Sequence, residues 1–130
     1  MARLGELERR VMDVLWGSMD AELTVRQVAE ELPRYAYTTL MTVLDRLHRK
    51  HMVLRTKDGR AHRYRAVASR ESYTAELMHE ALGAVVDRDA VLVRFAETVS
   101  PSEARVLRQA LATARADSGA QQGSRPGVAG

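Results

Sequence analysis

The chain has 130 residues, of which 45% are hydrophobic and none is cysteine. This length suits one compact domain or two small ones that share a core. The lack of cysteine excludes disulfides, thiolate metal sites and cysteine nucleophiles. The apolar runs are far shorter than the ~20 residues of a membrane span, and the charged N-terminus lacks the apolar segment of a secretory signal. We therefore expect a cytoplasmic protein that does not enter a membrane.

Positive charge is concentrated in one short segment, although the formal net charge is only +3. Residues 46–65 carry eight basic side chains and one acidic one, a balance of +7. The segments before and after it have balances of −3 and −1. A block of this kind indicates a polyanionic partner such as nucleic acid. The alternative is a solvated surface that happens to be basic.

Two helices are predicted in the first third of the chain. Apolar residues recur at helical spacing over residues 5–16. A second, shorter helix is predicted to begin after Thr24, which can cap it while Gln27 completes a capping box, and to end at Pro33.

The third predicted helix, residues 37–50, has two different faces. Its apolar stripe consists of Leu40, Val43, Leu44 and Leu47. The opposite face carries hydroxyl groups first and guanidinium groups later: Thr38, Thr42, Arg46 and Arg49. Threonine is a poor choice for packing inside a helix, so we interpret these threonines as functional.

A basic hairpin is predicted to follow. Residues 53–57 and 62–67 have strand character, and the Asp58-Gly59 pair between them is a turn signal. Three helices followed by a hairpin are typical of a winged helix-turn-helix. We therefore predict a mostly α fold, with a winged helix-turn-helix DNA-binding domain at residues 1–68.

The third helix and the hairpin are the predicted DNA-binding surface. The second helix of a helix-turn-helix unit enters the major groove with its N-terminal residues against base edges, and threonine offers both a hydroxyl and a methyl group there. The candidate DNA-binding residues are Tyr37, Thr38, Thr39, Met41, Thr42, Arg46, Arg49, Lys50, Arg60 and Arg63. Alternatively, each threonine could bond back to its own helix, and Tyr37 could cap the core.

Helices are predicted again from Ser69 onward. One extends to about Val85, one begins near Asp89, and one begins at Ser100 with strong start signals. So small a set of helices cannot bury its own apolar faces, so these faces pack either on the first domain or on a second copy of the chain. We favour the second copy and predict a helical dimerisation domain at residues 69–116. Its candidate contacts are Tyr73, Leu77, Leu82, Val91, Leu92, Phe95, Val99, Leu107 and Leu111. Residues 117–130 have the composition of a disordered tail.

Neither a metal site nor an active site is expected. His48, His51 and His62 could in principle bind a metal, but no carboxylate has the spacing to complete the site. No paired carboxylates, Ser/His/Asp arrangement or glycine-rich phosphate loop is present. We predict no cofactor and no enzymatic activity.

The chain resembles a known family of repressors. The runs LGELERRVMDVLW, TVRQVAEEL and AYTTLMTVLDRLHRKHMVLRTKDGRAHRYRAV are similar to those of the penicillinase and methicillin-resistance repressors, the BlaI/MecI/CopY type. The resemblance covers residues 4 to about 115 and is strongest over 4–67. It implies a homodimeric transcriptional repressor that binds dyad operators of TACA/TGTA character and controls a resistance or cell-envelope stress response. It also implies that Thr38, Thr39, Met41 and Thr42 belong to the recognition helix.

The sequence departs from this family in three places. Met41 replaces an arginine of the staphylococcal type, which implies a different base preference. The Asn–Phe bond that is cleaved after a membrane sensor protease responds corresponds here to Arg94-Phe95, so the resemblance leaves induction by such a protease open. Copper sensing through the C-terminal cysteines of the copper-responsive branch is excluded, because there are none.

A second function remains compatible with the sequence. The basic face could belong to a winged-helix module that binds an acidic protein rather than DNA. A gel-shift assay with genomic fragments distinguishes the two functions.

Overall fold

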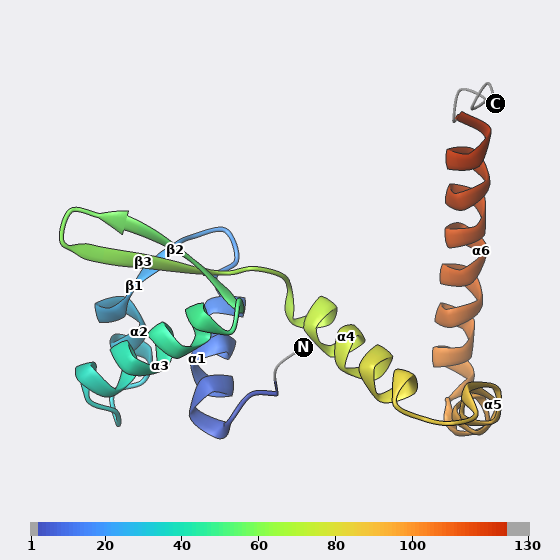
Figure 1. The fold of residues 1–130 in the computed structure, drawn as a ribbon, viewed down its shortest axis with the longest axis horizontal. Helices are drawn as coiled ribbons and strands as arrows, with labels where there is room; N and C mark the ends of the chain where they lie inside the picture. The colour runs from blue at the N-terminus through green and yellow to red at the C-terminus, as the bar shows by residue number, and fades with distance from the viewer. Residues whose placement is uncertain (1–2, 125–130) are drawn as a thin grey trace. The chain divides into compact units, whose positions relative to one another are not determined.

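The computed structural model describes residues 3–124, and the side chains of residues 3–117. The chain divides into two compact units, Met1–Ala81 and Leu82–Gly130. The elements of the first unit are α1 (Glu6–Trp16), β1 (Leu23–Thr24), α2 (Val25–Glu31), α3 (Tyr37–Arg49), β2 (Val53–Asp58), β3 (Ala61–Ala66) and most of α4 (Arg70–Gly83). The second unit contains α5 (Arg88–Thr98) and α6 (Pro101–Ser124) (Figure 1). The fold is mostly α and begins with a winged helix-turn-helix, as predicted.

The predicted capping boxes are present at two helix starts. At α2, the Thr24 hydroxyl accepts the Gln27 N–H at 3.2 Å, and the Gln27 side chain accepts the Thr24 N–H at 2.8 Å. At α6, Ser100 and Glu103 form the same reciprocal pair, at 3.1 and 2.8 Å. Backbone and side-chain hydrogen bonds from Ser100 lower the pKa of Glu103. These bonds satisfy N–H groups that a helix start otherwise leaves unpaired.

The end of α3 forces a histidine into a left-handed conformation. The Met52 N–H donates to the Leu47 carbonyl at 3.0 Å, and the His51 N–H donates to the His48 carbonyl at 3.1 Å. This is the Schellman pattern, which usually has glycine at the position that His51 occupies with φ 61°. The side chain of Met52 is thereby turned into the core, where Leu47 also lies.

The three strands form one antiparallel sheet in the order β1-β3-β2. The two long strands are joined by a two-residue turn, Gly59-Arg60, and Gly59 has φ 62°. Glycine at the first central position with φ above zero fits a type II′ hairpin turn. The short strand β1 was not predicted, because two residues are too few to show alternation.

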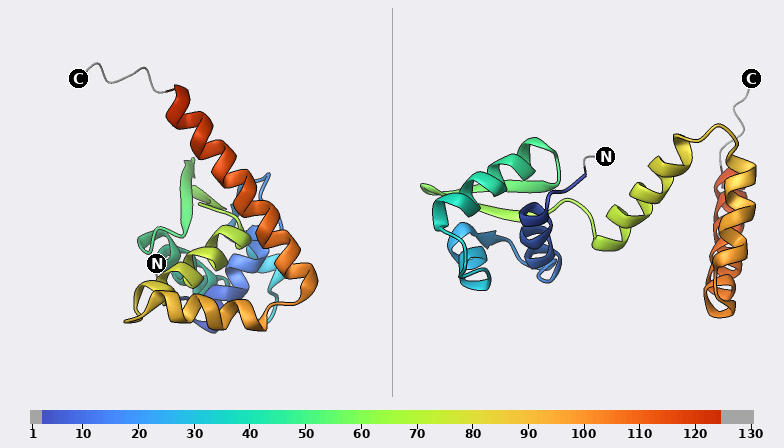
Figure 2. Two further views of the ribbon diagram at one scale, coloured as in Figure 1. Left: turned by 90° about the vertical axis from the view of Figure 1, so that its right-hand side faces the viewer. Right: turned by 90° about the horizontal axis from the view of Figure 1, so that it is seen from below.

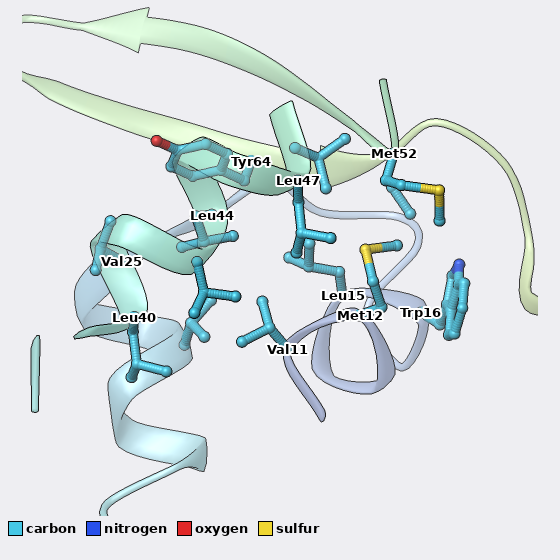
Figure 3. Packing of buried hydrophobic residues seen from close by; sticks show 14 of the residues in the cluster. Val11, Met12, Leu15, Trp16, Val25, Leu40, Leu44, Leu47, Met52 and Tyr64 are labelled. Atoms are coloured by element: carbon cyan, nitrogen blue, oxygen red, sulfur yellow. The ribbon is translucent and has the colours of Figure 1, made fainter. Parts of the chain in front are cut away.

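The core of the first unit lies between α1, α2, α3 and the sheet. Figure 3 shows Tyr64 of β3 and Met52 beside the apolar stripes of α1 and α3. The predicted stripe of α3 is confirmed, since Leu40, Leu44 and Leu47 are fully buried. The buried residues contributed by α1 are Val11, Met12, Leu15 and Trp16.

The start of α4 is part of this first core. The Trp16 indole N–H donates to the Ala68 carbonyl at 3.0 Å, and the Trp16 and Tyr73 ring centroids are 5.4 Å apart. The guanidinium groups of Arg9 and Arg70 each lie 5.4 Å from the Trp16 ring centroid. Trp16 therefore joins α1 to the first turns of α4.

Two predicted dimer contacts and the predicted domain boundary at residue 68 need correction. Tyr73 is buried in the first unit, and Leu77 packs against the same core. Their apolar spacing was read correctly, but periodicity does not reveal whether the covering surface comes from the same chain or from a partner. The boundary lies instead near the end of α4.

The second unit contains little buried surface of its own. Figure 2 shows α5 and α6 diverging from their connection at Val99 and Ser100. Helix α5 has no buried residue. The exposed large apolar residues of the two helices are Val91, Leu92, Val93, Phe95, Val106, Leu107 and Leu111.

Helix α6 is longer than the sequence predicted. It extends to Ser124, so the predicted disordered tail is wrong for residues 117–124, while residues 125–130 lie outside the described part. Alanine and glutamine favour helix, and an existing helix extends more readily than a new one begins. None of the helices described in residues 3–124 combines the length and hydropathy that crossing a membrane requires.

Candidate nucleic-acid interface

The outward face of α3 presents two parallel columns of side chains. Tyr37 and Met41, one turn apart, are 52% and 45% exposed. Thr38 and Thr42 form the neighbouring column, and both are exposed, as is Thr39. Residues four apart on a helix lie on the same face, so each column follows the helix axis away from its N-terminus.

The hydroxyl groups of this face are not equivalent. The Thr42 hydroxyl donates to the Thr38 carbonyl at 3.0 Å. The alternative that a threonine bonds back to its own helix thus applies to Thr42, which keeps an acceptor lone pair and a methyl group for a ligand. Within the described residues, the Thr38 and Thr39 hydroxyls make no hydrogen bond.

An aspartate organises the arginines farther along α3. Asp45 lies 2.9 Å from the Arg49 guanidinium and 3.3 Å from that of Arg55 on β2. Arg49 is nevertheless 69% exposed and can still exchange its carboxylate partner for a phosphate. Arg46 is exposed and forms no ion pair among residues 3–117. Of the predicted arginines on α3, Arg46 is thus the freer one.

Lys50 has a structural role instead of the predicted contact with DNA. Its ammonium group lies 2.8 and 2.9 Å from the two carboxylate oxygens of Glu8 on α1. The Lys50 side chain is only 29% exposed, and Glu8 is 5% exposed. Lys50 was predicted to contact DNA because it follows Arg49 in the sequence. At the end of α3, however, its side chain is directed toward the start of α1.

The pair is held in its charged form. Burial alone would raise the pKa of Glu8, but the Lys50 hydrogen bond, the Gly5 backbone N–H at 2.9 Å and the charges of Lys50 and Arg46 together lower it. A charged lysine and a charged carboxylate, both largely shielded from water, bind strongly to each other only in good geometry. Lys50 is therefore engaged by Glu8 and is not presented as an unpaired cation.

The hairpin supplies the other predicted basic contacts. Arg60 is exposed in the turn. Arg63 on β3 lies 2.8 Å from the Asp58 carboxylate and is 40% exposed. Lys57 and Arg65 are also exposed on the two strands and form no ion pair within the described part of the chain. The hairpin thus presents several cations, two of which, Arg55 and Arg63, are already paired with a carboxylate.

Two exposed arginines outside the basic block lie in or beside the helix-turn-helix. Arg26 lies in the first turn of α2, and Arg34 lies in the connection that leads into α3. Both are exposed and without an ion pair in residues 3–117. Counting charge along the sequence missed them, although the helix-turn-helix geometry that places α2 against α3 could have found them.

The histidines are not gathered into a metal site. His51 is exposed, whereas His48 and His62 are half-buried. Among the described residues, no three histidine, aspartate or glutamate side chains lie close enough to hold a metal ion.

Known sequences resemble this chain over most of its length. The penicillinase repressor family matches residues 4–113. Two Mycobacterium tuberculosis proteins, from strains CDC 1551 and H37Rv, are each named transcriptional regulator BlaI. Each is 49% identical to this chain over 125 residues, which cover 92% of the chain and 90% of the relative.

Solved structures give more distant matches. The multidrug efflux regulator MepR of Staphylococcus aureus matches with a TM-score of 0.48 and 17% identity, over 88% of this chain and 79% of its own. Streptococcus pneumoniae FabT in complex with DNA has a TM-score of 0.45 and 19% identity, over 86% and 73%. The sequence matches, not these, decide the assignment: the chain belongs to the penicillinase repressor family of DNA-binding transcriptional regulators, which are not enzymes.

Proposed function

We propose that this protein is a cytoplasmic, homodimeric repressor that reads a dyad operator. In this proposal α3 of each protomer lies in the major groove, and the hairpin holds the neighbouring backbone. The observation that carries it is the exposed face of α3, where uncharged hydroxyl and apolar groups come first and arginines follow. Bases are read by the first kind of group, and phosphates are bound by the second.

The dimer is supported by the apolar surface of the second unit. Phe95 and Leu92 of α5 are 43% and 49% exposed, and Leu107 and Leu111 of α6 are 42% and 63% exposed. Monomeric proteins rarely leave such surface open to water. A second copy of the chain, which carries the same surface, can cover it in a two-fold interface.

The target genes are proposed to include resistance or cell-envelope functions, because both curated relatives are named BlaI regulators. Induction by a sensor protease would have to act on Arg94-Phe95. This bond lies inside α5, and a protease needs a locally unfolded segment. Mapping the genomic sites that the protein occupies identifies the genes directly.

A binding assay tests the division of roles between bases and phosphates. Fluorescence anisotropy measures the affinity of the full chain for a selected operator and for random DNA at several salt concentrations. Thr39→Val removes one exposed hydroxyl at constant shape and should lower the preference for the operator about five- to tenfold. Arg60→Ala should weaken both duplexes about equally and make the affinity less dependent on salt.

Two outcomes contradict the proposal. If Thr39→Val and Arg60→Ala lower both affinities by the same factor, α3 does not read bases. If one protomer binds a single half-site as tightly as a dimer binds two half-sites one helical turn apart, the dyad is wrong. Binding to an acidic protein and to no duplex would favour the alternative interaction module.

A further inference from the structure

The base-reading part of α3 has an unusual chemical composition. We propose that it recognises thymine chiefly through the 5-methyl group, with Met41 as the principal contact. This inference rests on the proposed function, because it requires α3 to enter the major groove. The inference adds to that function which group of the base is recognised and which residue recognises it.

The groups that usually read purines are missing from the leading turns of α3. Specific contacts to guanine come mainly from arginine or lysine, and those to adenine from asparagine or glutamine, in bidentate pairs. Residues 37–42 are Tyr-Thr-Thr-Leu-Met-Thr and contain none of these four side chains. Direct bidentate reading of a purine is therefore not available to this part of the helix.

Apolar groups are available instead. Met41 is 45% exposed although the rest of its helix buries a complete apolar stripe. Tyr37 stands one turn before it on the same face and is 52% exposed, so its ring adds apolar surface to this column. The only methyl group that a base pair presents in the major groove belongs to thymine, and methionine is flexible enough to adapt to it.

The neighbouring column reinforces this preference. The Thr42 hydroxyl proton is already donated to the Thr38 carbonyl at 3.0 Å. Thr42 can therefore accept a hydrogen bond or contact a methyl group, but it cannot donate to the guanine O6 or N7 acceptors without breaking its own bond.

The surrounding charge identifies DNA as the occupant of the apolar column. Arg34 lies just before α3, and Arg46 follows Met41 by five residues; both are exposed and unpaired within residues 3–117. Exposed guanidinium groups near an apolar strip, with Arg46 one turn after Thr42 in the neighbouring column, suit a groove lined by phosphates. An apolar protein surface would leave these guanidinium groups without partners.

Replacing thymine by uracil tests the inference, because it removes only the methyl group. The full chain first selects duplexes from a random library. The enriched duplex is then synthesised with deoxyuridine at the half-site thymines, and separately with deoxyuridine only in the flanking DNA. Loss of each buried methyl should weaken binding about three- to fourfold, so a dyad with one contact per half-site should lose about tenfold. The flanking replacement should change nothing.

Met41 variants assign the effect to this side chain. Met41→Ala should reduce the thymine-to-uracil ratio from about tenfold to about twofold, since most of the apolar contact is lost. Met41→Leu, which keeps a similar volume, should retain most of the ratio. Because Met41 is half exposed, all variants should fold, as circular dichroism can verify.

The outcomes separate this inference from the function on which it rests. If the selected duplex and its uracil form bind equally, methyl recognition is wrong while operator recognition stands. If the ratio persists in Met41→Ala, another residue reads the methyl and the role of Met41 is wrong. If no duplex is enriched over random DNA, the proposed function fails and this inference fails with it.

Discussion

The two units of this chain differ in how far they bury their apolar side chains. The first surrounds a core of buried side chains that come from four helices and the sheet. The second consists of two helices whose apolar residues remain between 39% and 67% exposed. The first buries its apolar residues within one chain, whereas the second leaves them exposed. Both units have apolar periodicity. This pattern therefore predicts which helix face is apolar, but it does not predict which surface covers that face.

The largest expected effect is the loss of a core side chain from the first unit. Leu44→Ala removes a fully buried leucine and should lower the free energy of unfolding by about 3–5 kcal/mol. Urea denaturation followed by Trp16 fluorescence measures this, because Trp16 is the only tryptophan and lies in the first core. Leu111→Ala, which truncates a leucine that is 63% exposed in the single chain, is the matched control, measured at a protein concentration low enough for the monomer. Equal losses in the two variants would remove the distinction between the units.

A charge on the second unit should affect association instead of folding. Phe95→Glu places a carboxylate on the exposed face of α5. Central aromatic contacts in interfaces are often worth about 2 kcal/mol or more, so the dimer dissociation constant should rise at least about 30-fold. Sedimentation equilibrium measures it, and circular dichroism should show an unchanged helix content. An unchanged constant would mean that this face is not the dimer interface.

The pair between Glu8 and Lys50 should matter more than a surface ion pair. Glu8→Ala leaves the partly buried Lys50 ammonium without its partner and should lower the free energy of unfolding by about 2 kcal/mol. Glu6→Ala, which breaks an exposed pair with Arg10, should cost less than about 0.5 kcal/mol. Chemical denaturation of both variants measures the difference, and similar values would contradict the structural role of Lys50.

The pair between Glu8 and Lys50 also makes the free energy of unfolding depend on pH. The pKa of Glu8 is lowered from its ordinary value of 4.5, so its contribution is fully present above the unfolded-state pKa. It is lost as the pH falls through the lower folded-state pKa. Between neutral pH and this acidic range, wild type should lose more free energy of unfolding than Glu8→Gln. Parallel pH profiles would show that Glu8 makes no such contribution.

The smallest effect is a gain in stability. His51 adopts φ 61° at the end of α3, a conformation that is unfavourable for side chains other than glycine. His51→Gly should raise the free energy of unfolding by about 1 kcal/mol. His48→Gly places the same residue inside the helix and should be destabilising. If both substitutions act in the same direction, backbone conformation is not the cause.

Much of the first unit could be predicted from sequence because its signals are local. The stripe of α3, the capping box at Thr24 and the turn at Gly59 depend on residues a few positions apart. The contact of Tyr73 with Trp16 and that of Lys50 with Glu8 join residues distant in sequence, and no local pattern contains them. The strand β1 depends on its partner β3 in the same way.

The sequence indicated those parts of the candidate interface that follow from helical spacing or from a local cluster of charge. The face of α3 follows from helical geometry, and the structure places the predicted residues from Tyr37 to Thr42 on its exposed side. The bond from Thr42 to the Thr38 carbonyl depends on a rotamer that sequence does not specify. Arg26 and Arg34 were missed because both lie outside the basic block, and Arg26 is in α2, which only the fold packs against α3.

The carboxylates of Asp45 and Asp58 have a consequence for binding in solution. They hold the guanidinium groups of Arg49, Arg55 and Arg63, and so act as counterions that are covalently attached to the protein. When a phosphate takes over one of these arginines, it displaces a tethered anion, and the carboxylate it leaves behind attracts a cation from the buffer. Fewer ions are then released overall than the number of basic residues suggests. Arbitrary duplexes, which offer only phosphates, lose most from this exchange.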